Sequence, residues 1–438
     1  MNISFRKLIH NRLIAGTLCL TISGILCRGM GFFYRIFLSR TIGAQGLGLY
    51  QLVTPVLFLS ISFVCAGIST TISRFVSFEP KKANIYFMIG LTCSLGLSIL
   101  CGTLLYMEAD RIAFLFLKDE AAAPLIKIIG YSLVPSAFHN CINGYCYGKK
   151  KAVLPSVSQV IEQASRIIGV YLLYRFVTGE GKEFTAAIAA WGILIGEVAS
   201  FITCFHVVSQ MKKPKLTSIK KEQLHSFFEM AVPLTTNQLL SHACSSIEFL
   251  LIPQMLVVYG YTKEDALSVF GVLTGMALAV IVCPAVLVNS LCVMLLPEVA
   301  GAKGSRNPQT LHGLLHKILW FGLGFGILCS LFFLFSKNYI ANTLFQNALV
   351  ANYLSRLSFL CPLLYIESLL QSILNGQNHS KQVLAINLFS CAIRIGFIAL
   401  GIPRFGLEAY IWGMIAGSAV TVVLQLLTLR IPKESPLK

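Results

Sequence analysis

The 438-residue sequence contains few charged residues. Asp, Glu, Lys and Arg together make up 12% of it, against about 25% in soluble domains. Hydrophobic residues reach 56%, and the mean hydropathy is +0.75. Apolar runs near the ~20 residues that a bilayer-crossing helix needs recur along the whole chain. The ~10-residue alternating strands of a membrane β-barrel do not occur. The sequence therefore predicts an all-α polytopic membrane protein.

Motifs for metal, disulfide or enzyme chemistry are also missing. The 14 cysteines form no CxxC pair and fall mostly inside apolar runs, where cysteine is a small buried hydrophobe. His312 and His316 are spaced i, i+4, but no Cys or acid completes a ligand set. No nucleophile–base set or phosphate-binding glycine-rich loop is present. We therefore expect no enzyme activity, no metal and no cofactor.

Twelve membrane spans are predicted from the apolar runs. They lie near 13–38, 47–73, 84–107, 121–147, 152–176, 185–210, 227–258, 266–297, 310–335, 349–375, 382–402 and 406–430. A short amphipathic segment at 111–119 is expected to lie at the membrane surface. Basic residues precede the first apolar run, as in a signal peptide, but no small-residue cleavage site follows. We interpret this run as an uncleaved first span.

Acidic residues are scarce relative to basic ones. There are 18 Asp and Glu against 35 Lys and Arg, a formal net charge of +17. The N-terminus, the even-numbered loops and the C-terminus together hold 21 of the basic residues, and the odd-numbered loops hold 8. By the positive-inside rule, both termini are expected in the cytoplasm. The basic charge is thus explained by topology and adjacent anionic lipid, and no nucleic-acid partner is expected.

The chain is predicted to contain two six-helix lobes, 1–210 and 227–438, joined by a basic cytoplasmic linker at 211–226. The stretch "GYCYGKKKAVLPSVSQVIEQASR" in the first lobe parallels "ILNGQNHSKQVLAINLFSCAIR" in the second. In each, an arginine (Arg166, Arg394) follows a glycine (Gly148, Gly376) by 18 residues. Six spans per repeat give parallel topology, for which a substrate site is expected between the halves.

Two arginines lie in the first predicted span, "GILCRGMGFFYRIF" at 24–37. Arg28 and Arg35 are seven residues apart, which is about two helical turns, so they share one helix face. An ionisable residue inside a span costs at least ~2.5–3.5 kcal/mol and usually faces a cavity or a partner. Arg28 lies near mid-span and favours a cavity lining. For Arg35, snorkelling to the membrane surface is an equal alternative.

Other polar side chains occur within predicted spans. The seventh span carries Asn237, Ser241, Ser245 and Glu248 on one face, with His242 beside it, and the tenth carries Glu367, Gln371 and Asn375. In the fifth span, Glu162 and Arg166 are spaced i, i+4. This spacing fits either a self-neutralising structural ion pair or a functional pair. Because arginine forks match phosphate, the pattern favours a polyanionic substrate such as a pyrophosphate head group.

The stretches "GFFYRIFLSRTIGAQGLGLYQLVTP" (31–55) and "GYCYGKKKAVLPSVSQVIEQASRI" (144–167) resemble the stage V sporulation protein B branch of the polysaccharide flippases. These belong, with the lipid II flippases, to the multidrug/oligosaccharidyl-lipid/polysaccharide transporter superfamily. The resemblance implies a MATE-like, V-shaped pair of six-helix lobes related by a parallel pseudo-two-fold. It also implies cavity arginines that hold a substrate pyrophosphate: Arg28 and Arg35 match this role, and Arg74 matches it more weakly. The eighth span contains no convincing equivalent of a cavity arginine, and Asn289 is the most polar residue in its middle. The chain has twelve predicted spans, whereas many relatives have fourteen.

The predicted function is a flippase that exports lipid-linked saccharide across the bacterial cytoplasmic membrane for peptidoglycan or sporulation. Arg166 and Arg394 would line or shape the lobes, and Glu248 and Glu367 could couple movement to protons, to sodium or to the membrane potential. One alternative is a cation-coupled multidrug exporter, which predicts a cavity dominated by acids. Another is a non-transporting scaffold that recruits cell-wall synthesis proteins, for which Arg28 would be replaceable.

Overall fold

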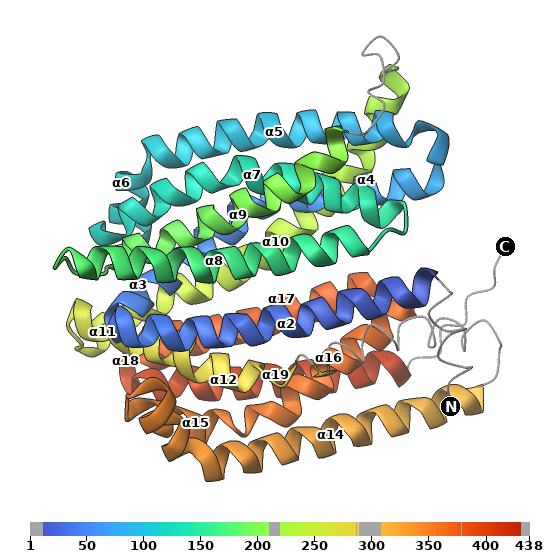
Figure 1. The fold of residues 1–438 in the computed structure, drawn as a ribbon. Coiled ribbons are helices and arrows are strands. Elements are labelled where there is room, and N and C mark those ends of the chain that lie inside the picture. Colours follow the sequence, from blue (N-terminus) through green and yellow to red (C-terminus); the bar gives the residue numbers. More distant parts are fainter. Residues whose placement is uncertain (1–11, 210–219, 286, 289–307, 378, 431–438) are drawn as a thin grey trace, which may run out of the picture. The chain divides into compact units, whose positions relative to one another are not determined.

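The computed structural model describes residues 12–209, 220–285, 287–288, 308–377 and 379–430, and within them every regular element is a helix (Figure 1). Each predicted span corresponds to a helix or to a run of consecutive helices. The end of the eighth span (289–297), Asn289 and most of the basic linker lie outside the described residues. The chain divides into two compact units, Met1–Ser246 and Ile247–Lys438.

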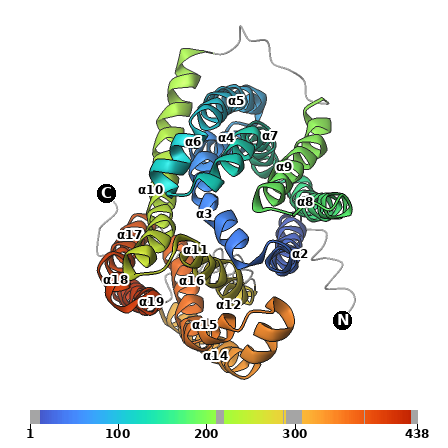
Figure 2. The same cartoon turned by 90° about the vertical axis from the view of Figure 1, so that its left-hand side faces the viewer.

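The first unit is a bundle of long helices. In order, it contains α2 (Arg12–Thr41), α3 (Gly43–Ile61), η1 (Ser62–Ala66), α4 (Gly67–Phe78), η2 (Pro80–Lys82), α5 (Ala83–Met107), α6 (Ala109–Ile112), η3 (Ala113–Leu117), η4 (Glu120–Ala122), α7 (Ala123–Gly148), α8 (Val153–Gly179), α9 (Ala186–Ser209) and the first part of α10 (Lys221–Tyr259). Helix α7 packs against α4, α5 and α9, and α8 packs against α9 and α2 (Figure 2).

Small residues allow close helix contacts in this unit. A Cβ at Gly102 of α5 would lie 2.6 Å from the carbonyl oxygen of Gly130 on α7, so both positions exclude larger side chains. The core includes fully buried Ile72, Ile142 and Phe227. Because Phe227 belongs to α10, the start of that helix is part of the first unit. The two units therefore divide within α10, and the predicted lobes 1–210 and 227–438 stay a prediction.

The second unit continues from α10 through α11 (Lys263–Gly271), η6 (Val272–Ala277), α12 (Leu278–Val282), α14 (Pro308–Tyr339), η7 (Ile340–Phe345), α15 (Leu349–Leu357), α16 (Leu360–Gly376), α17 (Ser380–Gly396), η8 (Phe397–Gly401), α18 (Ile402–Phe405) and α19 (Leu407–Arg430). Helix α16 packs against α14 and α19, and α17 packs against α19. The buried Tyr365 hydroxyl donates to the Ile281 carbonyl oxygen at 3.1 Å, which ties α16 to α12. Helices α15 and α16 are bent by 52° relative to each other.

Nine helices among the described residues are long and apolar enough to cross a membrane, or ten if the bent pair α15–α16 forms one span. Helices α2 and α8 are not among them; these carry Arg28, Arg35 and the Glu162–Arg166 pair. Large apolar side chains such as Phe33 and Phe335 are exposed on the helices, which is the arrangement expected of a surface covered by lipid rather than by water.

A local structure repeats in the two units. The π-helices η3 and η7 both end at a residue in the left-handed region, Lys118 (φ 58°) and Gln346 (φ 52°). The next residue, Asp119 or Asn347, accepts a hydrogen bond at 3.0 Å from the backbone N–H two positions on. In the first unit this turn belongs to the predicted surface segment 111–119, whose residues 114–116 expose large apolar side chains.

Candidate functional site

The arginine-bearing face of α2 lies beside α8. Gly31 is three residues after Arg28 and four before Arg35, so the three share a face. A Cβ at Gly31 would lie 3.3 Å from the Gln163 amide nitrogen of α8. The Arg28 side chain is exposed and that of Arg35 is half-buried, near enough to Tyr50 of α3 to interact electrostatically. Helix α2 contains no acidic residue.

Arg166 of α8 forms an ion pair within its own helix. Its Nη2 lies 2.8 Å from Glu162 Oε1, and the two side chains are 21% and 19% exposed. A Cβ at Gly196 of α9 would lie 3.0 Å from the Glu162 carbonyl oxygen and 3.3 Å from Arg166 Nε. Because Gly196 has no side chain, α9 can approach α8 closely. The Arg166 guanidinium packs at this point of close approach. The contact favours the structural alternative for this pair.

Arg394 of α17 forms its ion pair between two helices. Its Nε donates to both carboxylate oxygens of Glu248 on α10, at 2.9 and 3.0 Å, and its Nη2 lies 2.9 Å from Oε1. Its Nη1 donates to the Ser390 hydroxyl at 2.9 Å. A Cβ at Gly417 of α19 would lie 3.0 Å from Arg394 Cγ. Glu248 is 5% exposed, so Arg394 neutralises a buried acid.

The two arginines occupy matching places in the two units. Gly148 and Gly376 are the last residues of α7 and α16. Arg166 and Arg394 follow them by the same number of residues. The arginines then pack against a glycine of the next long helix, Gly196 or Gly417. The repeat predicted from the sequence thus extends to side-chain packing.

A buried polar cluster in the first unit escaped the sequence analysis. His139 of α7 and Glu197 of α9 are each 5% exposed, and His139 Nε2 lies 2.8 Å from Glu197 Oε2. His139 Nδ1 lies 2.7 Å from the Ser200 hydroxyl, which is hydrogen-bonded to that of Ser158. The signal that could have revealed it was an acid, Glu197, in the middle of an otherwise apolar span.

The remaining predicted residues are not brought together with these clusters into a single site. Ser241 donates to the Asn237 carbonyl oxygen of its own helix at 3.1 Å, and both side chains are exposed. His242 stacks on Phe58 with ring centroids 5.7 Å apart. The predicted stripe on α10 is divided, because these residues belong to the first unit and Glu248 to the second.

The other predicted side chains lie on two further helices. Glu367 and Gln371 are half-buried on α16. Oε2 of Glu367 is buried and makes no hydrogen bond within the described part of the chain. Arg74 is exposed near the end of α4. No group of three or more His, Cys, Asp or Glu side chains able to hold a metal ion occurs among the described residues.

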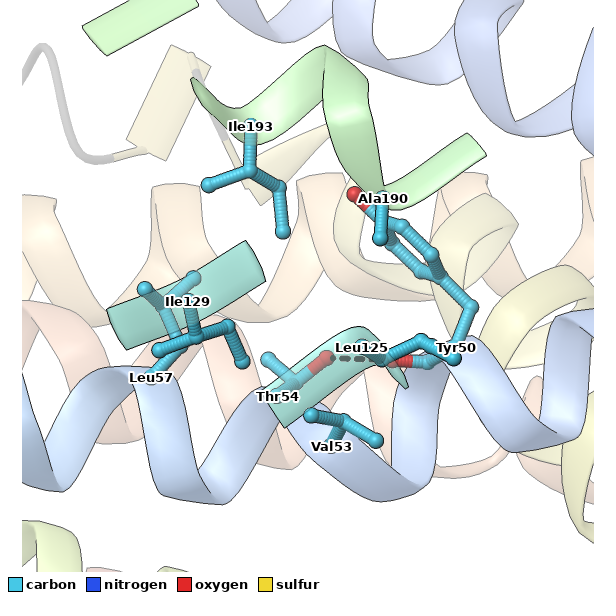
Figure 3. Close-up of a pocket in the computed structure, with 8 residues that line it drawn as sticks. All are labelled: Tyr50, Val53, Thr54, Leu57, Leu125, Ile129, Ala190 and Ile193. Carbon is cyan, nitrogen blue, oxygen red and sulfur yellow. Dashed lines mark hydrogen bonds between the residues drawn. The ribbon is translucent and has the colours of Figure 1, made fainter. Parts of the chain in front are cut away.

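A pocket in the first unit lies between α3, α7 and α9. Figure 3 shows the Tyr50 ring of α3 reaching towards Ala190 of α9, with Thr54 and five aliphatic side chains around it. The Thr54 hydroxyl donates to the Tyr50 carbonyl oxygen at 3.1 Å. The pocket has a cavity volume of about 10 Å³, close to the smallest space that holds one water molecule. Its lining is too apolar and its volume too small for a saccharide phosphate.

Taken together, the long apolar helices and the two repeated units define a multi-span helical membrane protein. Solved structures agree on the fold. The chain is similar to an inward-facing multidrug resistance MATE family transporter of the MOP superfamily, with a TM-score of 0.74, 17% identity and coverage of 95% of this chain and 97% of that one. The fold is thus the MATE fold.

The chain belongs to the family of polysaccharide biosynthesis proteins, which it matches over residues 13–259, and the MatE family matches 241–400. Stage V sporulation protein B of Bacillus subtilis (strain 168) is 25% identical over 95% of this chain and 83% of its own length. The lipid II flippase MurJ of the same organism is 24% identical over 45% of this chain and 39% of its own length.

Proposed function

We propose that this protein moves a lipid-linked saccharide, a precursor of peptidoglycan or another polysaccharide, across the bacterial cytoplasmic membrane by alternating access, with both termini in the cytoplasm. The observation that carries the proposal is α2, a 30-residue helix with Arg28 and Arg35 on one face and no acid in its sequence. A pyrophosphate group that enters the membrane with its lipid needs fixed cations, and arginine binds phosphate through paired N–H donors.

The two acids that pair with arginine agree with this choice of substrate. Glu162 and Glu248 each face an arginine at hydrogen-bond distance, so neither offers an unneutralised carboxylate to a cationic drug. A multidrug exporter would need such carboxylates. In the proposed mechanism Arg28 and Arg35 bind the head-group phosphates, whereas Arg166 and Arg394 stabilise their own units. The substrate drives the cycle because it binds the two access states with different affinities.

Complementation tests the proposal. The full chain is expressed in cells depleted of their lipid II flippase, and survival is scored beside Arg28→Ala, Arg35→Ala and the double variant. We expect the wild type to restore growth and the double variant to lose it. Arg175→Ala, a change of an exposed arginine near the end of α8, is the matched control and should restore growth.

Membrane levels of each variant are measured by immunoblot, so that loss of protein is separated from loss of transport. Growth restored by the double Arg28/Arg35 variant at normal levels would remove these arginines from substrate binding. It would also favour a scaffold that recruits cell-wall synthesis proteins. Failure of the wild type at normal levels would exclude lipid II as a substrate.

A further inference from the structure

The His139–Glu197 pair is the most buried ionisable pair among the described residues of the first unit. It joins α7 to α9, two helices that pack along much of their length. The charged groups that act on His139 are Glu197 from α9, and Glu162 and Arg166 from α8. Among the other elements that pack against α7, α3 and α5 carry no Asp, Glu, His, Lys or Arg. The charged residues of α4, α6 and η4, which also pack against α7, have exposed side chains: Arg74, Asp110, Arg111 and Glu120.

The net charge of this four-residue group depends on one proton. When both carboxylates are ionised, Glu162 and Glu197 contribute two negative charges, and Arg166 contributes one positive charge. With His139 protonated the group is neutral; with His139 neutral it carries one uncompensated negative charge. An uncompensated charge in a membrane-spanning bundle is unfavourable until water reaches it. The closed packing of α7 on α9 therefore favours the protonated form.

The hydroxyl neighbours of His139 suit both forms of the ring. His139 Nε2 lies 2.8 Å from Glu197 Oε2 and 3.2 Å from the Asn140 amide nitrogen. Because an ionised carboxylate only accepts, we assign the Nε2 proton to the contact with Glu197. The Ser200 hydroxyl can accept from Nδ1–H or donate to a bare Nδ1. It is also hydrogen-bonded to the Ser158 hydroxyl, which lies 3.4 Å from the Cys204 sulfur. Loss of the Nδ1 proton therefore reverses the Ser200 hydrogen bond without moving any heavy atom.

The second unit has no such pair at the matching positions. His139 lies nine residues before Gly148, and Glu367 lies nine residues before Gly376. Glu197 directly follows Gly196, where Ser418 follows Gly417 in the second unit. At the matching positions, the second unit therefore has an acid, Glu367, and a serine, Ser418, and no histidine. At these matching positions, only the first unit has a histidine, the side chain whose ordinary pKa lies near neutral pH.

We propose that His139 and Glu197 form a proton-binding site whose occupancy holds the first unit closed. One proton is bound at His139 Nδ1 in the closed packing of α7 on α9. When these helices separate and water enters, the proton passes to water and the imidazole becomes neutral. The link to transport rests on the proposed function; the proton site itself does not.

Hydrogen–deuterium exchange on the full chain in lipid nanodiscs tests the site without any substrate. Exchange of the segments around 136–146 and 192–204 is measured from pH 5.5 to 8.5 and corrected for intrinsic rates. If opening releases one proton, the opening constant rises with pH by up to about tenfold per unit. His225→Gln, the same change at an exposed histidine, should keep this dependence.

Two variants make the test specific. Glu197→Gln leaves Glu162 and Arg166 balanced, so the neutral imidazole becomes the favoured closed form and the pH dependence should reverse its sign. His139→Gln combined with Glu197→Gln gives a neutral group that cannot titrate, so the segments should stay protected at every pH. A flat wild-type profile, or a double variant that keeps the wild-type slope, would overturn the proposal.

A transport measurement separates the site from the proposed function. Liposomes containing the full chain receive a fluorescent polyprenyl-pyrophosphate disaccharide, with or without an imposed pH gradient. We expect the gradient to accelerate transport by the wild type and not by the double variant. A wild type that shows the exchange profile but moves no probe would count against the saccharide substrate and leave the proton site intact. Equal acceleration of the double variant would refute the coupling role.

Discussion

Replacing Glu248 by Gln should strongly destabilise the second unit. The substitution keeps the side-chain shape but removes the charge that three nitrogen–oxygen contacts from Arg394 neutralise. Breaking a buried ion pair on one side costs about 3–5 kcal/mol. Because the Arg394 side chain keeps 22% of its surface exposed, water relieves part of this cost, and we expect about 3 kcal/mol. For a unit of this size, that corresponds to a melting temperature lower by roughly 6–12 °C.

The assay is differential scanning fluorimetry of the full chain in detergent at a fixed scan rate. The control is Arg356→Gln, which breaks the ion pair with Glu408 in the same unit, where the side chains are 46% and 55% exposed. Exposed pairs contribute about 0–1 kcal/mol. Replacing Glu248 by Leu and Arg394 by Met together should recover most of the loss, because no buried charge remains. If Glu248→Gln lowers the melting temperature no more than Arg356→Gln does, the pair is not buried in the way argued above.

Two further predictions concern helix contacts in the first unit. Gly196→Ala would place a methyl group 3.0 Å from the Glu162 carbonyl oxygen and should cost about 1–3 kcal/mol by separating α8 from α9, measured as a lower melting temperature. Gly67→Ala would place one 2.1 Å from the Thr235 hydroxyl and 2.5 Å from its backbone nitrogen, so folded protein recovered from membranes should fall sharply. Gly96→Ala, which meets nothing within 4 Å, should be neutral or slightly stabilising; an equal loss for all three would show that helix contacts are not the cause.

Hydropathy was sufficient to predict the helices, because burial in lipid requires an apolar run of nearly fixed length. It also predicted spans at α2 and α8, but these two charge-bearing helices are not among the described helices that are apolar enough to cross a membrane. Hydropathy contains no information on which helices pack together. The division between the units therefore falls within α10, at a point that no change of composition marks. The same holds for the π-helices η3 and η7, since their sequences resemble ordinary helix.

The candidate site was predictable where it depends on spacing along one helix. The shared face of Arg28 and Arg35 and the i, i+4 pair on α8 both follow from 3.6 residues per turn. The partner of Glu248 lies 146 residues away, so no local pattern could supply it. His139 and Glu197 lie on different helices, so no spacing along one helix joins them. Glu197, as an acid within an apolar span, could have been singled out from the sequence, but its partner could not.

The two arginine pairs differ in a way that bears on movement within each unit. Arg166 and its acid lie on the same helix, so α8 can shift against α9 without separating opposite charges. Arg394 and Glu248 lie on α17 and α10, so any sliding of these helices would pull a buried ion pair apart at a cost of several kcal/mol. The first unit also holds the pair whose charge changes with one proton. Protonation of the His139–Glu197 pair can therefore shift the internal packing of the first unit, whereas in the second unit the contact between Arg394 and Glu248 holds α17 to α10.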